Sequence, residues 1–195
     1  MDNLANQLSA LLNKRERTTR AEWDARPAAV LIPIYFDQAD WHLVYTRRTE
    51  QVENHRGQVS FPGGLVEQRD ESALEAALRE AEEEIALRKE TVQILGSLDA
   101  LLTVTQFQII PFIGQIPWPY EFKPNPDEVA RVFSVPLRWL RDPHNLELHH
   151  RQPIPDGPEV PVYYFKPYQG EVIWGATARI TINFLEIITP ILSGE

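Results

Sequence analysis

The chain contains no cysteine among its 195 residues. This excludes disulfide bonds, cysteine-ligated zinc and thiol catalysis. No apolar run approaches the roughly 18 residues that a membrane-spanning helix needs. The first residues also lack the basic start and the long apolar core of a signal peptide. We therefore expect a soluble, cytoplasmic protein that has no membrane partner.

Positive charge is scarce as well. Nineteen lysines and arginines stand against 28 aspartates and glutamates, which gives a formal net charge of −9 and a pI near 5.1. This balance argues against unassisted binding to nucleic acid or to an anionic membrane. An anionic substrate would need metal ions or a local basic patch to approach. The length favours one domain with a core of ordinary size.

One acidic stretch organises the chain, and it begins with the pair Gly63-Gly64. Adjacent glycines predict a tight turn whose backbone can approach a ligand closely. Ser72 followed three residues later by Glu75 has the pattern of a capping box. We therefore expect a helix that starts near Ala73.

Three carboxylates share one side of this helix. At about 100° per residue, Glu80, Glu83 and Glu84 fall within an arc of about 100° beside an apolar stripe. Like charges at this spacing, near the end of a helix, destabilise it, and only Arg79 lies where it offsets them. Glutamates alone are typical of a solvated helix face. Together with the glycine turn and the cap, they favour a site for Mg²⁺ or Mn²⁺, which take oxygen ligands.

These residues together resemble the Nudix box, Gly-x5-Glu-x7-Arg-Glu-apolar-x-Glu-Glu-x-Gly-apolar. The matching positions are Gly64, Arg79, Glu80, Ala81, Glu83, Glu84 and Leu87. The interval from Gly64 to Arg79 is one residue longer than the common spacing, so the earlier acidic position is either Asp70 or Glu71. Ala86 stands where the box has glycine. The resemblance implies an α/β (α+β) Nudix fold, a mixed β-sheet sandwiched between helices, over residues 1–195.

The segment before the glycine pair is similar to the signature of the coenzyme A pyrophosphatase branch of that family. The matching residues are Arg48, His55, Gly57, Gln58, Val59, Ser60, Phe61, Pro62, Gly63 and Gly64. Glu53 stands where this pattern usually has arginine, and Thr49 where it has serine. Later echoes of the branch are residues 125–129 and 173–178.

By this resemblance, substrate-binding roles are expected for Arg48, His55, Gln58 and Phe61. The residues by themselves leave alternatives open. Arg48 can pair with phosphate as a planar donor or be a surface arginine at a strand end. His55 can bond phosphate or hold the neighbouring turn, and Phe61 can stack on a base or belong to the core.

The resemblance implies a metal-dependent hydrolase that cleaves the pyrophosphate bond of a nucleoside diphosphate derivative. Coenzyme A or a derivative, giving 3′,5′-ADP and 4′-phosphopantetheine, is the first expectation. ADP-ribose, NADH or a dinucleoside polyphosphate are alternative substrates. A second alternative is a non-catalytic domain that binds a nucleotide. The oligomeric state stays open.

Roles follow for the acidic residues. Glu80 and Glu84 are expected to be the principal ligands of Mg²⁺ or Mn²⁺, with Glu83 and the carbonyl of Gly64 as further ligands. Arg79 is expected to orient Glu83. A general base is also needed; Glu128 is the candidate, with Asp127 and Glu83 as alternatives.

Hydrophobic periodicity and turn residues predict the remaining elements. We expect a helix and a linker at 1–20, strands near 28–36, 41–46, 92–105, 107–116, 128–135 and 162–165, a loop at 143–161, and a C-terminal helix at 176–191. Strands with helices on both faces indicate a layered α/β or α+β sandwich.

Overall fold

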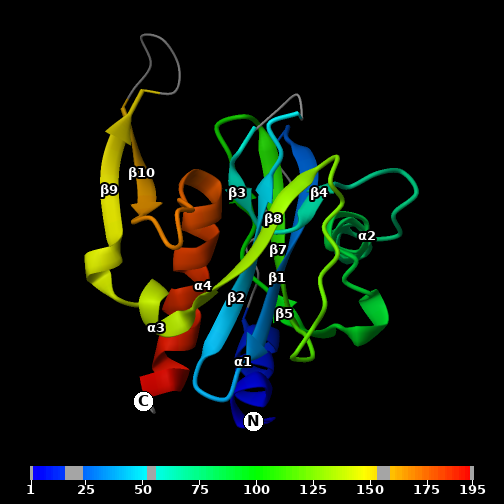
Figure 1. Ribbon diagram of the computed structural model, residues 1–195, viewed down its shortest axis with the longest axis vertical. Helices are drawn as coiled ribbons and strands as arrows, with labels where there is room; N and C mark the ends of the chain where they lie inside the picture. The colour runs from blue at the N-terminus through cyan, green and yellow to red at the C-terminus, as the bar shows by residue number, and fades with distance from the viewer. Residues whose placement is uncertain (1, 16–23, 52–55, 153–158, 194–195) are drawn as a thin grey trace.

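The computed structural model describes residues 2–15, 24–51, 56–152 and 159–193. Its centre is a mixed eight-stranded sheet, which confirms the expected class (Figure 1). The sheet contains β1 Arg26–Phe36, β2 Trp41–Arg48, β3 Val59–Ser60, β4 Gly63–Leu65, β5 Gln93–Ser97, β6 Leu101–Leu102, β7 Phe107–Gln115 and β8 Val129–Pro136. The other elements are β9 Leu146–Arg151, β10 Val160–Phe165, α1 Asp2–Lys14, α2 Ala73–Ile85, α3 Leu137–Leu140, α4 Gly175–Ser193 and the 3₁₀ turns Lys89–Thr91 and Pro143–Asn145.

Strand β1 is the middle of the sheet. It runs parallel to β7 on one edge, and on the other edge β2 pairs with residues 34–36 while β4 pairs with residues 28–30. The sheet therefore forks along this edge, because beyond β1 the same edge of β2 pairs with β3 through Thr46 and Arg47, while its other edge pairs with β8. The fork places Gly63 and Gly64 beside residues 28–30, next to the helix that follows them.

Helices cover both faces of the sheet (Figure 1). On one face, Ala81 of α2 packs in a buried cluster that contains Leu31 of β1. On the other face, Leu8 of α1 and Phe184 of α4 share a second cluster with Ile32. Successive residues of β1 thus enter opposite clusters, as the alternation of side chains along a strand requires. Burial on both faces explains why the sequence of β1 is almost continuously apolar.

Two expectations about the strands were wrong in part. Residues 143–161, expected to form a loop, contain β9, which pairs antiparallel with β10. Most of β9 is exposed, and its apolar alternation is limited to Leu146 and Leu148, which is too short to reveal a strand. The expected strand at 92–105 is divided into β5 and β6, and the register of β5 shifts between Ile94 and Gly96.

The two ends of the described chain lie at one end of the molecule. Figure 1 shows the start of α1 and the finish of α4 close to each other, whereas β2 runs from that end toward the opposite one. Among the described residues, no helix combines the length and the apolar character needed to cross a membrane.

Candidate active site

Local contacts fix both ends of α2. Ser72 Oγ accepts a hydrogen bond from the Glu75 N–H at 3.2 Å, so the predicted cap is confirmed. The Glu75 carboxylate accepts from the backbone N–H of Glu71 at 2.6 Å, one residue before the position of a standard capping box. At the C-terminal end, Ala86 adopts φ 54° and ψ 33°, and its N–H donates to the backbone carbonyl of Glu82 at 3.0 Å. Glycine adopts this left-handed conformation without strain, which explains the glycine of the box.

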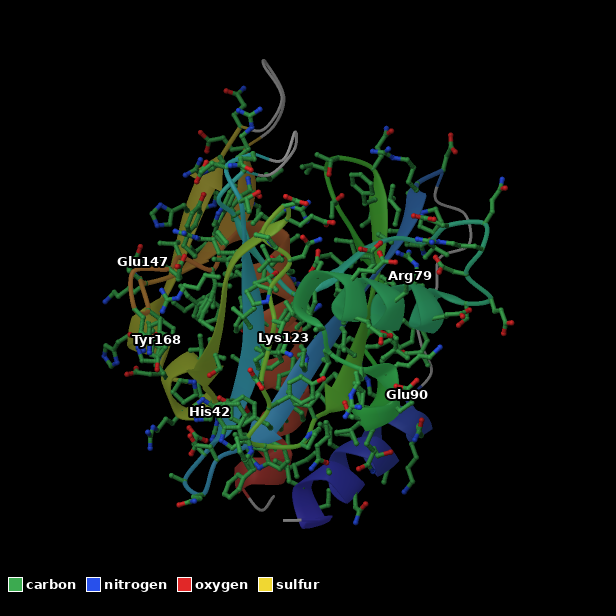
Figure 2. The ribbon with its side chains drawn as sticks, turned by 45° about the vertical axis from the view of Figure 1, so that its right-hand side comes forward. His42, Arg79, Glu90, Lys123, Glu147 and Tyr168 are labelled. Carbon is green, nitrogen blue, oxygen red and sulfur yellow. The ribbon has the colours of Figure 1, made fainter. Side chains whose placement is uncertain are left out.

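Arg79, which Figure 2 labels on α2, is the hub of an ion-pair network. Its Nε and Nη2 donate to the two carboxylate oxygens of Asp70 at 2.9 and 3.2 Å. Its Nη1 donates to Glu80 at 2.9 Å and to Glu83 at 3.1 Å. The hydrogen bond from Arg79 lowers the pKa of Asp70. Asp70, rather than Glu71, therefore pairs with the arginine of the box.

Glu84 is the most deeply buried acid of the helix, with a side chain that is 2% exposed. Its Oε1 lies 3.6 Å from Arg48 Nη1, and the N–H of Gly63 donates to its carboxylate. Its Oε2 is buried and has no hydrogen-bond partner within the described chain. Burial raises the pKa of Glu84 to about 8, against the effect of Arg48; the charges of Glu80 and Glu128 raise it further.

Glu80 lies directly against the glycine turn. A Cβ atom added at Gly64 would lie 2.6 Å from Glu80 Oε1, so only glycine leaves room for this carboxylate. Burial raises the pKa of Glu80, while the hydrogen bond from Arg79 opposes the increase. Glu83 is at the rim of the site, with a side chain that is 48% exposed.

The chemistry of these residues fits a divalent cation. Within the described ranges, no three Asp, Glu or His side chains form a ready-made ion cage; Glu80 is instead bonded to Arg79, and Glu84 faces Arg48. The buried Oε2 of Glu84 nevertheless has no hydrogen-bond partner among the residues that the structure describes. Because Gly64 has no side chain, the Glu80 carboxylate can lie directly against the Gly64 backbone. Hard cations such as Mg²⁺ take such oxygen ligands.

Glu128 belongs to the same acidic group. Its negative charge raises the pKa of both Glu80 and Glu84. Asp127, the alternative base, is exposed. Sequence reasoning missed Thr49, whose N–H donates to the Glu128 carbonyl at 2.9 Å. The available signal was the residue type, because the branch signature has a hydroxyl side chain at this position and the Thr49 hydroxyl donates to the Asp127 carbonyl at 3.2 Å.

The predicted substrate-binding residues are not all at the site. Arg48 lies at the site beside Glu84. Its backbone N–H donates to the carbonyl of Gln58 at 3.0 Å, so Gln58 lies next to Arg48. Of the two alternatives left open for Phe61, the structure favours the core, because its side chain belongs to the buried cluster and is 2% exposed. His55 and Glu53 lie outside the described residues.

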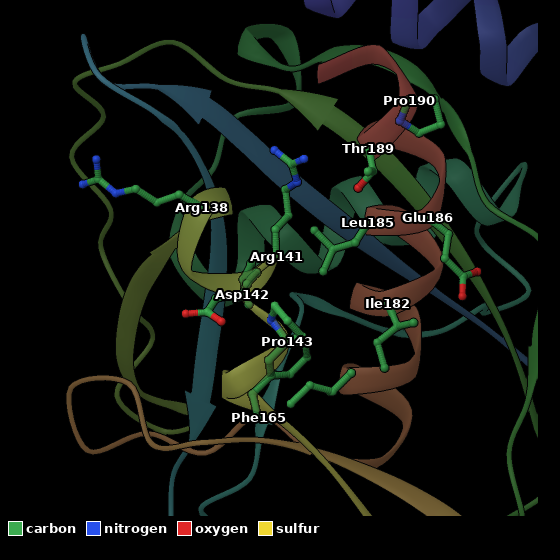
Figure 3. Close-up of a pocket in the computed structure, with 12 residues that line it drawn as sticks. Arg138, Arg141, Asp142, Pro143, Phe165, Ile182, Leu185, Glu186, Thr189 and Pro190 are labelled. Atoms are coloured by element: carbon green, nitrogen blue, oxygen red, sulfur yellow. The ribbon is translucent and has the colours of Figure 1, made fainter. Parts of the chain in front are cut away.

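A separate hollow of about 840 Å³ lies between α4 and the segment that follows α3. Figure 3 shows Ile182 and Leu185 of α4 facing Pro143 across it. Helix α4 covers the face of the sheet opposite α2, so this hollow is not part of the acidic site.

Comparison with known proteins places this site in a family. The NUDIX domain family matches residues 25–157. The uncharacterised Nudix hydrolase NudL of Pectobacterium atrosepticum is 41% identical over 158 residues, which are 80% of this chain and 79% of the relative. NudL of Cronobacter sakazakii is 37% identical over 187 residues, 92% and 94% of the two chains.

Solved structures show the same fold. A MutT/nudix family protein from Enterococcus faecalis has a TM-score of 0.55 at 13% identity and covers 94% of this chain and 69% of its own. RenU, a Nudix hydrolase from M. smegmatis, has a TM-score of 0.51 at 19% identity, with 62% and 76% covered. Nudix hydrolases generally use divalent metal ions. The acidic helix, the matched family and the relatives agree, and the chain therefore belongs to the Nudix family as a pyrophosphohydrolase.

Proposed function

We propose that this enzyme cleaves the pyrophosphate bond of coenzyme A or a coenzyme A derivative, with Mg²⁺ or Mn²⁺, and releases 3′,5′-ADP and 4′-phosphopantetheine. The single observation that carries the metal-dependent part is the Glu84 carboxylate. It is buried, one oxygen has no partner in the described chain, and two further acids lie close enough to raise its pKa. Such an arrangement is unfavourable unless a cation joins it.

Each side chain has a distinct task in this proposal. Glu80 and Glu84 would hold the cation, with Glu83 and the Gly64 carbonyl as further ligands. When bound, the metal supplies positive charge that offsets the repulsion between the phosphoanhydride and a nucleophile, and it makes water more acidic. Arg79 keeps Glu80 and Glu83 in place through bonds of 2.9 and 3.1 Å.

The remaining groups act on the substrate and on water. Arg48 is mainly buried beside Glu84, from which it can turn a planar guanidinium toward a phosphate. Glu128 accepts a proton from the attacking water. The water oxygen bonds to phosphorus while the bridging P–O bond breaks. The leaving phosphate departs as an anion.

The choice of coenzyme A is supported by the signature from Arg48 to Gly64, of which most positions match. Glu53 reverses a charge in that signature. This departure is the specific reason to keep ADP-ribose, NADH and dinucleoside polyphosphates as second candidates.

A panel of phosphoanhydrides tests the substrate. Coenzyme A, dephospho-coenzyme A, ADP-ribose, NADH and a dinucleoside tetraphosphate are each incubated with Mg²⁺ or Mn²⁺, and the products are resolved by chromatography. We expect the highest kcat/KM for coenzyme A and a lower value for dephospho-coenzyme A, because the latter lacks the 3′-phosphate. Equal values for these two would contradict recognition of that phosphate, and preference for another compound would replace the proposed substrate.

Two variants test the metal ligands. Glu80→Gln and Glu84→Gln should each lower kcat/KM on the order of 100-fold or more, since several kcal/mol of charge stabilisation is lost. Glu82→Gln is the matched control, because Glu82 is on the same helix and exposed. If both ligand variants keep wild-type turnover, the assignment of these residues is wrong.

A further inference from the structure

Asn125 contacts two functional parts of the site at once. Its backbone N–H donates to the carbonyl of Glu84 at 2.8 Å. Its side-chain Nδ2 donates to Glu128 Oε1 at 3.4 Å. One residue therefore connects the helix end that carries the buried acid with the carboxylate of the candidate base.

The turn that follows Asn125 fixes the direction of Glu128. Asn125 Oδ1 accepts from the N–H of Asp127 at 3.2 Å. The Asn125 carbonyl accepts from the N–H groups of Glu128 and Val129 at 3.1 and 2.8 Å. An asparagine that bonds its own backbone two residues on is a standard way to hold a turn. These contacts of Asn125 thus fix the backbone of Glu128, and with it the position from which the Glu128 side chain extends.

A second contact holds the turn from the other side. Thr49 donates its N–H to the Glu128 carbonyl at 2.9 Å and its hydroxyl to the Asp127 carbonyl at 3.2 Å. Thr49 directly follows Arg48, which faces Glu84. The segment from 125 to 128 is therefore fixed between the end of α2 and the end of β2, and little freedom remains except at the Glu128 side chain.

We propose that Asn125 is a positioning residue for the general base: its amide holds one oxygen of Glu128 and leaves the other free to accept a proton from water. This inference rests on the proposed function, because it takes Glu128 as the base. The physical need is clear. Glu80 and Glu84 repel a third carboxylate, and without a donor Glu128 would turn away from them. Catalytic hydrogen bonds in a ligand-free site are often long and shorten with substrate, in keeping with 3.4 Å.

The test uses Asn125→Asp in the full chain. Aspartate keeps the oxygen that accepts from Asp127 and all the backbone bonds, but it replaces the amide donor with a charged oxygen that repels Glu128. We expect kcat to fall about 10-fold or more, because the hydrogen bond to a charged group is lost and a repulsion is added. KM and the melting temperature should stay close to those of the wild type. The matched control is Asn145→Asp, which removes an amide donor to the Trp139 carbonyl at 3.0 Å outside the acidic site and should leave kcat unchanged.

A double-mutant cycle with Glu128→Gln separates the possible results. If Asn125 acts through Glu128, Asn125→Asp has no further effect on kcat in the Glu128→Gln background. Independent, multiplicative losses would overturn the proposal, as would a normal kcat for Asn125→Asp while Glu128→Gln is impaired. A parallel loss of kcat, substrate affinity and stability would show a merely structural role and also overturn it. If Glu128→Gln keeps wild-type kcat, the base assignment itself fails, and the positioning role fails with it.

Discussion

The Glu84 carboxylate raises the free energy of the metal-free fold, because its charge is placed where water cannot solvate it. Its ordinary pKa of 4.5 rises to about 8 in the folded chain. Between these values the unfolded chain releases a proton that the folded chain retains. The free energy of unfolding therefore falls as the pH rises from about 4.5 to about 8.

Glu84→Gln should remove this pH-dependent loss of stability. In metal-free protein, the melting temperature of the variant should match the wild type near pH 4 and exceed it increasingly toward pH 8, because the glutamine carries no charge to desolvate. Calorimetry in the presence of a chelator measures both proteins across this range. Identical pH profiles would show that Glu84 is solvated after all.

Gly64→Ala should damage activity far more than stability. The new Cβ would lie 2.6 Å from Glu80 Oε1, and the flexible carboxylate can move away without disturbing the core. We expect kcat/KM to fall at least about 10-fold, since misplacing a metal ligand weakens its charge stabilisation. Steady-state kinetics and thermal unfolding are measured on the same samples.

Gly170→Ala provides the opposite case for comparison. Gly170 has φ +86° and nothing within 4 Å of an added Cβ, so alanine is strained there without touching the site. This control should lose on the order of 1 kcal/mol of stability and keep its kcat. If Gly64→Ala behaves in the same way, the contact with Glu80 has no functional importance.

Helix α2 is an element whose ends matter as much as its acidic side. Ser72 starts it, and the left-handed Ala86 ends it with bonds from successive N–H groups back to the last turn. The Nudix box has glycine at the latter position. Alanine in this conformation is strained by roughly 1–2 kcal/mol relative to the right-handed region.

Ala86→Gly should therefore stabilise the protein. Relief of the left-handed strain exceeds the extra freedom that glycine gives the unfolded chain, so we expect a gain of about 0.5–1 kcal/mol. Urea unfolding measures it. Ala77→Gly in the helix interior is the control and should be destabilising. A loss of stability in Ala86→Gly as well would mean that the alanine methyl group makes a packing contact worth more than the strain.

For the molecule as a whole, local patterns predicted what local forces decide. The Ser72 cap, the apolar central strands and the acidic side of α2 all follow from short-range patterns. The choice between Asp70 and Glu71 does not follow from spacing. It depends on the path of the chain between Gly64 and Arg79, which is one residue longer than in the common box. For Phe61 the sequence left stacking on a base and a place in the core open, and the core cluster that it joins contains residues far apart in the chain.

Other parts of the molecule were missed for the same reason. Strand β9 exposes most of its side chains, so only its pairing with β10 identifies it. The Thr49 hydroxyl and the Asn125 N–H donate to backbone carbonyls that are 78 and 41 positions away in the sequence. These contacts form only when the sheet has assembled, and the sequence around each residue does not encode the partner.

The position of the chain ends has a practical meaning. Both ends are at the base of the molecule in Figure 1, while Arg48 closes a strand that climbs away from it. An affinity tag, a sensor chip or a fused carrier attached at either end would therefore lie at the end of the molecule away from Arg48. Binding and turnover can therefore be measured on immobilised protein.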